Sequence, residues 1–120
     1  MNRENRLILI PKYEKYIEYI LLIITKMPRT EKFNIGNEFK KSMYETLEKI
    51  LYINKTDSNK RIYYLNIIDT KLNCQRIYLR IMFNNKWIDN KKYKVAFEYL
   101  SEIGKILGGL TKSYATNDKK

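Results

Sequence analysis

The chain has 120 residues, enough for one domain with a modest core. It carries 24 basic and 13 acidic residues, a net charge of +11, with 44 % hydrophobic residues but only four glycines and two prolines. This composition excludes a disordered chain and favours long helices with short turns. With no histidine and one cysteine, Cys74, the sequence also excludes histidine metal sites, catalytic triads and intrachain disulfides.

Two helices are predicted in the first half of the chain. Helical spacing predicts a helix over residues 11–27, with Pro11 at its first position and Pro28 ending the pattern. A second helix is predicted over residues 31–54, with Thr30 as N-cap and Gly36 as a candidate bend. Their expected core residues are Tyr13, Tyr16, Ile17, Ile20 and Ile24 in the first helix, and Phe39, Met43, Leu47, Ile50 and Asn54 in the second.

Two longer helices are predicted in the second half. One covers residues 59–84, with cap candidates at residues 56–58, and the other covers residues 90–113, with Asp89 as N-cap. Residues 114–120 are expected to form a polar tail. The expected core residues are Leu65, Ile68, Leu72, Leu79 and Phe83 in the third helix, and Tyr93, Phe97, Leu100, Ile103, Leu107 and Leu110 in the fourth.

Four such helices predict an all-α fold, an antiparallel up-down four-helix bundle that occupies residues 1–120 as a single domain. The first and third helices are apolar on two sides. A helix of this kind needs a partner on each side, so we expect a homo-oligomer. The alternative is a set of isolated exposed side chains, which soluble proteins tolerate. The candidate interface residues are Leu21, Leu22, Ile23, Ile67, Cys74, Ile77, Tyr78 and Ile81.

The positive charge is unevenly distributed. Residues 31–57 carry five basic and five acidic residues, whereas residues 58–84 carry five basic residues and one acid, Asp69. Clustered lysines and arginines are typical of phosphate contacts; the alternative is the coding bias of an AT-rich genome. Asp69 is expected to form a buried ion pair with Arg76 or Arg80. The candidate nucleic-acid contacts are Lys60, Arg61, Lys71, Arg76, Arg80, Lys91, Lys94, Lys105 and Lys112.

Three glycines lie within six residues of the last predicted helix. Each costs about 1 kcal/mol relative to alanine in a helix interior. Because Gly104 and Gly108 are four residues apart, they share a face that a neighbouring helix can approach closely. The alternative is a helix stop in which Gly108 and Gly109 form the C-cap.

The sequence offers no catalytic residues, cofactor site or membrane segment. No phosphate-binding glycine loop is present, and we expect no enzyme activity. The apolar stretch at residues 7–10 is too short for a signal peptide, and the longest apolar run, residues 20–24, falls far below the ~18 residues of a membrane span. With a single thiol, these features favour the cytoplasm.

Three segments together resemble the accessory variability determinant (Avd) proteins of diversity-generating retroelements. They are residues 33–55, "IIDTKLNCQRIYLRI" at residues 67–81, and "LSEIGKILGGLTKS" at residues 100–113. The resemblance covers residues 11–114 and departs from the expected pattern at Gln75, where leucine is expected. The same family is similar to the four-helix-bundle proteins encoded in ribosomal RNA intervening sequences.

This resemblance implies a basic homopentamer of helical bundles that binds RNA and DNA. It further implies a partner reverse transcriptase, whose template-primed, error-prone cDNA synthesis the protein supports without being a polymerase itself. Two alternatives remain open. One is a free-standing RNA-binding bundle of the intervening-sequence type, and the other is a helical protein-interaction module without nucleic-acid function.

Overall fold

The computed structural model describes the backbone of residues 3–118, and the side chains of residues 8–57 and 59–114. Over this range the chain folds into helices and turns, without a strand. The helices are α1 (Arg3–Thr25), α2 (Arg29–Lys32), α3 (Ile35–Ile53), α4 (Ser58–Asn84) and α5 (Asn90–Asp118).

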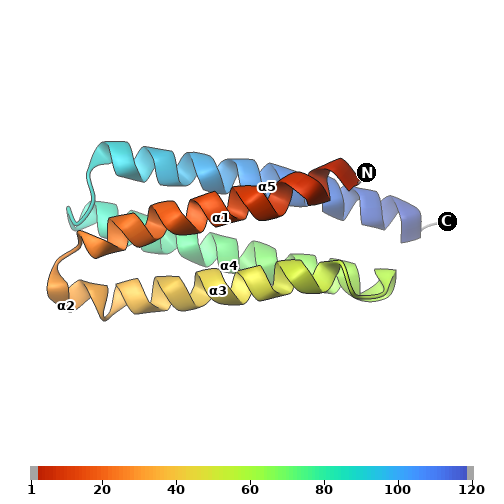
Figure 1. The fold of residues 1–120 in the computed structure, drawn as a ribbon, viewed down its shortest axis with the longest axis horizontal. Coiled ribbons are helices and arrows are strands. Elements are labelled where there is room, and N and C mark those ends of the chain that lie inside the picture. The colour runs from red at the N-terminus through yellow and green to blue at the C-terminus, as the bar shows by residue number, and fades with distance from the viewer. Residues whose placement is uncertain (1–2, 119–120) are drawn as a thin grey trace.

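The four long helices lie side by side along one axis, in a molecule of 51 × 22 × 21 Å (Figure 1). Around the bundle, α3 packs against α1 and α4, and α5 packs against α4 and α1. Figure 1 places both termini at the same end as the turn between α3 and α4, and places α2 with the α4–α5 turn at the other end. The predicted antiparallel four-helix bundle is therefore confirmed.

The first helix begins eight residues earlier than predicted. It starts at Arg3 and continues through Pro11, which therefore lies inside the helix and not at its first position. Proline removes one backbone hydrogen bond and disfavours a helix interior. Here Leu9 and Tyr13, on either side of the exposed proline, are both buried in the core, and this packing holds the helix together.

The predicted second helix is interrupted near its start. Residues 29–32 form the single turn α2, and the chain then bends at Phe33 and Asn34 before α3 begins, so Thr30 is not an N-cap. Gly36 is buried just after this bend. A Cβ atom there would lie 3.0 Å from Cγ2 of Ile24 and 3.2 Å from the backbone oxygen of Glu31. Glycine thus lets the start of α3 pack closely against the end of α1.

The two C-terminal helices differ in how closely they follow the prediction. α4 matches its predicted range to within one residue, and Asp89 caps α5 by accepting a hydrogen bond of 2.8 Å from the backbone N–H of Lys92. The expected polar tail is wrong over most of its length, because α5 continues to Asp118. Tyr114, at the start of that segment, is buried in the core. Residues 119–120 lie outside the described range.

The predicted core stripes are largely confirmed. All five predicted residues of the first helix are buried, as are Leu65, Ile68, Leu72 and Leu79 in α4. Asn54, predicted in the core, is exposed, because α3 ends at Ile53, which is buried in its place. The remaining predicted core side chains that are only half-buried are Leu47, Phe83, Tyr93 and Phe97.

A polar layer crosses the middle of this core. The side chain of Gln75 is fully buried; it accepts a hydrogen bond of 2.7 Å from the hydroxyl of Tyr16 and donates to Ser42 and Thr46 at 3.1 and 3.2 Å. The hydroxyl of Tyr13 donates to the backbone oxygen of Met43 at 2.8 Å. Every one of these buried side chains thus has a partner, which removes the penalty for burying it.

Candidate nucleic-acid and subunit interfaces

One face of α5 points away from the core and carries four lysines. Lys91, Lys94, Lys105 and Lys112 recur at three- and four-residue multiples, and all four are exposed. The acidic residue Glu98 lies on the same face of the helix as these lysines. The nearby Glu102 accepts an ion pair from Lys12 of α1. We call this surface the lysine face; it carries an excess of positive charge within reach of solvent.

Two basic candidates on α4 are engaged inside the subunit. The guanidinium of Arg61 lies 5.0 Å from the ring centroid of Tyr114, and its Nε is buried without a hydrogen-bond partner. Lys71 donates a hydrogen bond of 3.0 Å to Glu45 of α3. That contact holds the pKa of the Glu45 carboxyl below its usual value. Lys71 is thus already paired, and both side chains are engaged in contacts within the subunit.

The expected ion pair of Asp69 is wrong. Asp69 is exposed and makes no salt bridge among the described residues. Arg76 instead donates to Oδ1 of Asn73 at 2.6 Å and to the backbone oxygen of Leu100 at 3.4 Å, so it ties α4 to α5. The buried positions of α4 next to Asp69 are occupied by Ile68 and Leu72, and Asp69 lies on the exposed side of the helix. Arg80 and Lys60 are exposed.

The two helix-packing glycines do not meet a neighbouring helix backbone within the subunit. A Cβ at Gly104 would lie 3.1 Å from Nη2 of Arg76, the end of a flexible side chain. A Cβ at Gly108 would meet nothing within 4 Å, and this residue is exposed among the lysines of α5. The close approach of a neighbouring helix predicted for this face is therefore not found within the subunit.

The outer side of α4 carries an uncovered apolar stripe opposite the core. Its members recur at alternating spacings of four and three residues, the pattern of a coiled-coil seam. Ile77 is 49 % exposed and Ile81 is 40 % exposed. We call this stripe the α4 outer face; its residues are Tyr63, Ile67, Thr70, Cys74, Ile77 and Ile81.

The other candidate interface residues divide between core and surface. Ile23 is buried in the core of its own subunit, so its placement in an interface is wrong. It lies on the side of α1 that faces the bundle, together with Ile20 and Ile24. Leu21 is half-buried and Leu22 is 54 % exposed. Tyr78 also packs internally, with its ring centroid 5.7 Å from that of Phe39. A hydrogen bond with Cys74, together with burial, raises the pKa of Tyr78 to about 12.

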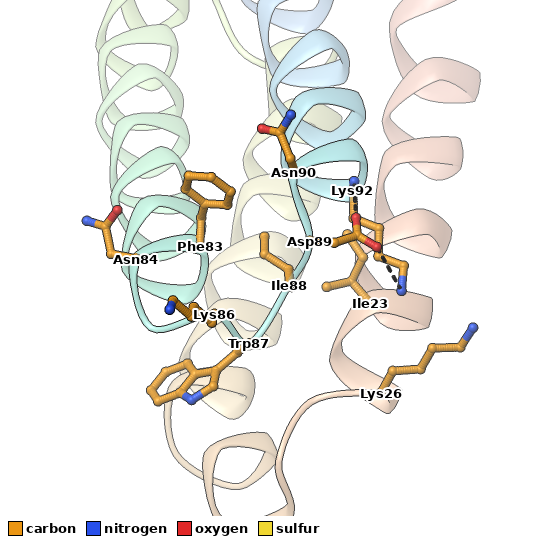
Figure 2. Close-up of a pocket in the computed structure, with 10 residues that line it drawn as sticks. All are labelled: Ile23, Lys26, Phe83, Asn84, Lys86, Trp87, Ile88, Asp89, Asn90 and Lys92. Atoms are coloured by element: carbon orange, nitrogen blue, oxygen red, sulfur yellow. Dashed lines mark hydrogen bonds and ion pairs between the residues drawn. The ribbon is translucent and has the colours of Figure 1, made fainter.

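A hollow of about 640 Å³ lies at the α4–α5 turn, and sequence reasoning did not find it. Its walls come from the ends of α1 and α4, the turn itself and the start of α5, as Figure 2 shows. Because α1 and the α4–α5 turn are far apart in the sequence, no local motif marks the hollow. We call it the turn pocket; it is lined by Ile23, Lys26, Phe83, Asn84, Lys86, Trp87, Ile88, Asp89, Asn90 and Lys92.

The chain leaves α4 through a capping motif that normally contains glycine. The N–H of Lys86 donates to Phe83 at 3.0 Å and the N–H of Trp87 donates to Met82 at 2.9 Å, the two bonds of a Schellman motif. Lys86 takes the left-handed position, with φ of 63°. A side chain there costs roughly 1 kcal/mol, which glycine would avoid. The residue at this position, where glycine is usual, is thus a lysine, and it lies at the rim of the turn pocket.

Two further features of the described residues bear on function. They contain no group of three or more histidine, cysteine, aspartate or glutamate side chains that could hold a metal ion. Among the same residues, no helix combines the length and the apolar character needed to cross a membrane.

The fold and its surfaces define an all-α bundle protein whose candidate sites lie on its outer faces and at one turn. Within this class, the sequence pattern of the bAvd-like family matches residues 7–114, so the chain belongs to the bAvd-like family. The resemblance to Avd proteins is thereby confirmed. A comparison with curated proteins gives no match.

Proposed function

We propose that this protein is the basic, oligomeric, cytoplasmic accessory subunit of a diversity-generating retroelement. In this role it holds RNA or DNA and the partner reverse transcriptase during mutagenic cDNA synthesis, without catalysing a reaction itself. The observation that carries the proposal is the lysine face of α5, where four exposed lysines share one side of a helix in a bAvd-like chain.

The lysine face and the α4 outer face have different roles in this proposal. The lysine face supplies phosphate contacts, which are independent of sequence and weaken with salt. The α4 outer face buries its isoleucines against a second copy of the chain. Assembly then repeats each lysine face once per subunit, so contacts that are weak singly add up to firm binding of a long strand.

Binding measured at several salt concentrations tests the proposal. We expect the double variant Lys94→Ala with Lys105→Ala to weaken binding of RNA and DNA alike. Removing one lysine–phosphate interaction should reduce the slope of log K against log salt by roughly 0.7–0.9. Both side chains are exposed, and neither makes an ion pair among the described residues, so the fold should be unaffected.

The matched control is Lys15→Ala with Lys41→Ala, which removes the same charge from exposed positions of α1 and α3. Fluorescence anisotropy of labelled oligonucleotides gives both slopes. Equal slopes for the two double variants would show that the charge acts diffusely and would remove the lysine face from the proposal. The partner is tested separately, by co-purification with the reverse transcriptase of the same element.

A further inference from the structure

The turn pocket has aromatic and apolar walls open to solvent. Trp87 and Phe83 stand on the side of α4, and Ile23 and Ile88 form the apolar floor. Trp87 is half-buried, so its indole keeps an accessible surface. Aromatic rings of this kind stack on nucleobases of any sequence. A hollow of about 640 Å³ falls within the ordinary size range of ligand pockets.

The polar part of the pocket favours an anion. Lys26 and Lys86 make no ion pair among the described residues, whereas Lys92 is shared with Asp89 at 4.0 Å. The lining therefore holds three cations and one carboxylate, and two of the cations are available to a ligand.

Two amides complete the lining. The side chains of Asn84 and Asn90 are exposed and make no hydrogen bond with the described residues. An amide offers both a donor and an acceptor, which matches the edge of a nucleobase. Aromatic surface, amides and lysines available to a ligand around one hollow are the three chemistries that a base bearing a phosphate requires.

We propose that the turn pocket binds a nucleoside phosphate, with the base against Trp87 and the phosphate near Lys86, which lies beside Trp87 at the α4–α5 turn. A free nucleotide and the terminal nucleotide of a strand share this chemistry. The inference deepens the proposed nucleic-acid function and takes its biological meaning from it. The lysine face would hold the strand along its length, while the turn pocket would hold one nucleotide.

Lys86 permits a test that does not endanger the fold. Lys86→Gly removes the cation, and glycine fits the left-handed position at least as well as lysine does. Weaker ligand binding in this variant cannot be attributed to unfolding. Lys41→Ala, which removes an exposed lysine that does not line the pocket, is the matched control.

Trp87 is the only tryptophan of the chain, so its fluorescence reports directly on the pocket. We expect adenosine monophosphate to quench it saturably, and to bind roughly fivefold or more tightly than inorganic phosphate, because phosphate alone lacks the stacking contribution. Lys86→Gly should weaken the nucleotide by roughly two- to fivefold, as expected for one partly exposed charge contact. Lys41→Ala should leave it unchanged.

A second arm uses labelled oligonucleotides with and without a 5′ phosphate, with anisotropy and Trp87 fluorescence recorded together. Stronger quenching by the phosphorylated strand identifies a strand end as the source, and quenching by the free nucleotide alone identifies a free nucleotide; either supports the inference. The inference is overturned if oligonucleotides bind in a salt-dependent way but no ligand changes the fluorescence of Trp87. That result would not contradict the proposed function. Equal binding of phosphate and nucleotide, or no effect of Lys86→Gly, also overturns it. Nucleotide quenching without oligonucleotide binding would instead contradict the proposed function.

Discussion

The buried side chain of Gln75 joins three helices through hydrogen bonds that a leucine could not make. It connects α4 to Tyr16 of α1 and to Ser42 and Thr46 of α3. Since an unpaired amide in the core would be heavily penalised, these bonds favour one register of the three helices over slipped alternatives. The departure from leucine at this position is thus compensated by polar residues on the facing helices.

The two tyrosines of this region predict a loss of stability at alkaline pH. Burial raises the pKa of both Tyr13 and Tyr16 above 10.0, the value expected in the unfolded chain. The unfolded state therefore releases protons that the folded state retains, so stability is complete below pH 10 and falls as the pH rises further. We expect about 1.4 kcal/mol per pH unit for each buried phenol, measured by denaturant unfolding on both sides of pH 10.

Removing one phenol isolates this effect from lysine titration, which all variants share. Tyr13→Phe should make the decrease of unfolding free energy with pH less steep, by the contribution of one buried phenol, about 1.4 kcal/mol per pH unit. Tyr44→Phe, which removes a phenol that is 45 % exposed, is the control and should behave as the wild type. An unchanged slope in Tyr13→Phe would show that the burial of Tyr13 does not control its ionisation.

At the scale of the helices, periodicity predicts their number and core faces but not all of their ends. Pro11 indicates a helix start because a proline usually disfavours a helix interior, yet packing on both sides of it outweighs one missing hydrogen bond. The bend before α3 follows from a contact between Gly36 and Ile24, residues whose proximity the sequence does not reveal. Tyr114 extends α5 because Arg61 covers its ring, which is again a tertiary effect.

Replacing the glycines of α5 by alanine should stabilise the helix through its propensity, and this gain should be smaller where the added Cβ meets a neighbouring atom. Gly108→Ala should raise the unfolding free energy by about 1 kcal/mol, because its Cβ meets nothing within 4 Å and alanine is the better helix former. Gly104→Ala should gain less, since Arg76 must shift away from a contact of 3.1 Å. Thermal unfolding of both variants measures the difference. A lower midpoint for Gly108→Ala would show that a second chain packs closely against this glycine.

At the scale of the whole molecule, charge and composition predict that the surface is basic, but they do not predict which basic residues are available on it. The excess of lysine is visible in the sequence, but the pairing of Lys71 with Glu45 and of Arg61 with Tyr114 depends on how the helices dock. The turn pocket cannot be predicted from the sequence for the same reason, because its lining joins two segments, residues 23–26 and 83–92, that meet only in the folded chain.

The proposed function, with its lysine face repeated once per subunit, requires the assembly that we propose through the α4 outer face. The mass of the wild-type protein in solution, from light scattering coupled to gel filtration, tests this claim most directly. We predict several times 14.6 kDa at micromolar concentration, and five times that value if the homopentamer implied by the family resemblance forms. Ile77→Glu, at a position 49 % exposed in the single chain, should reduce the mass to that of a monomer with helicity retained. A wild-type mass of 14.6 kDa under the same conditions would contradict the claim.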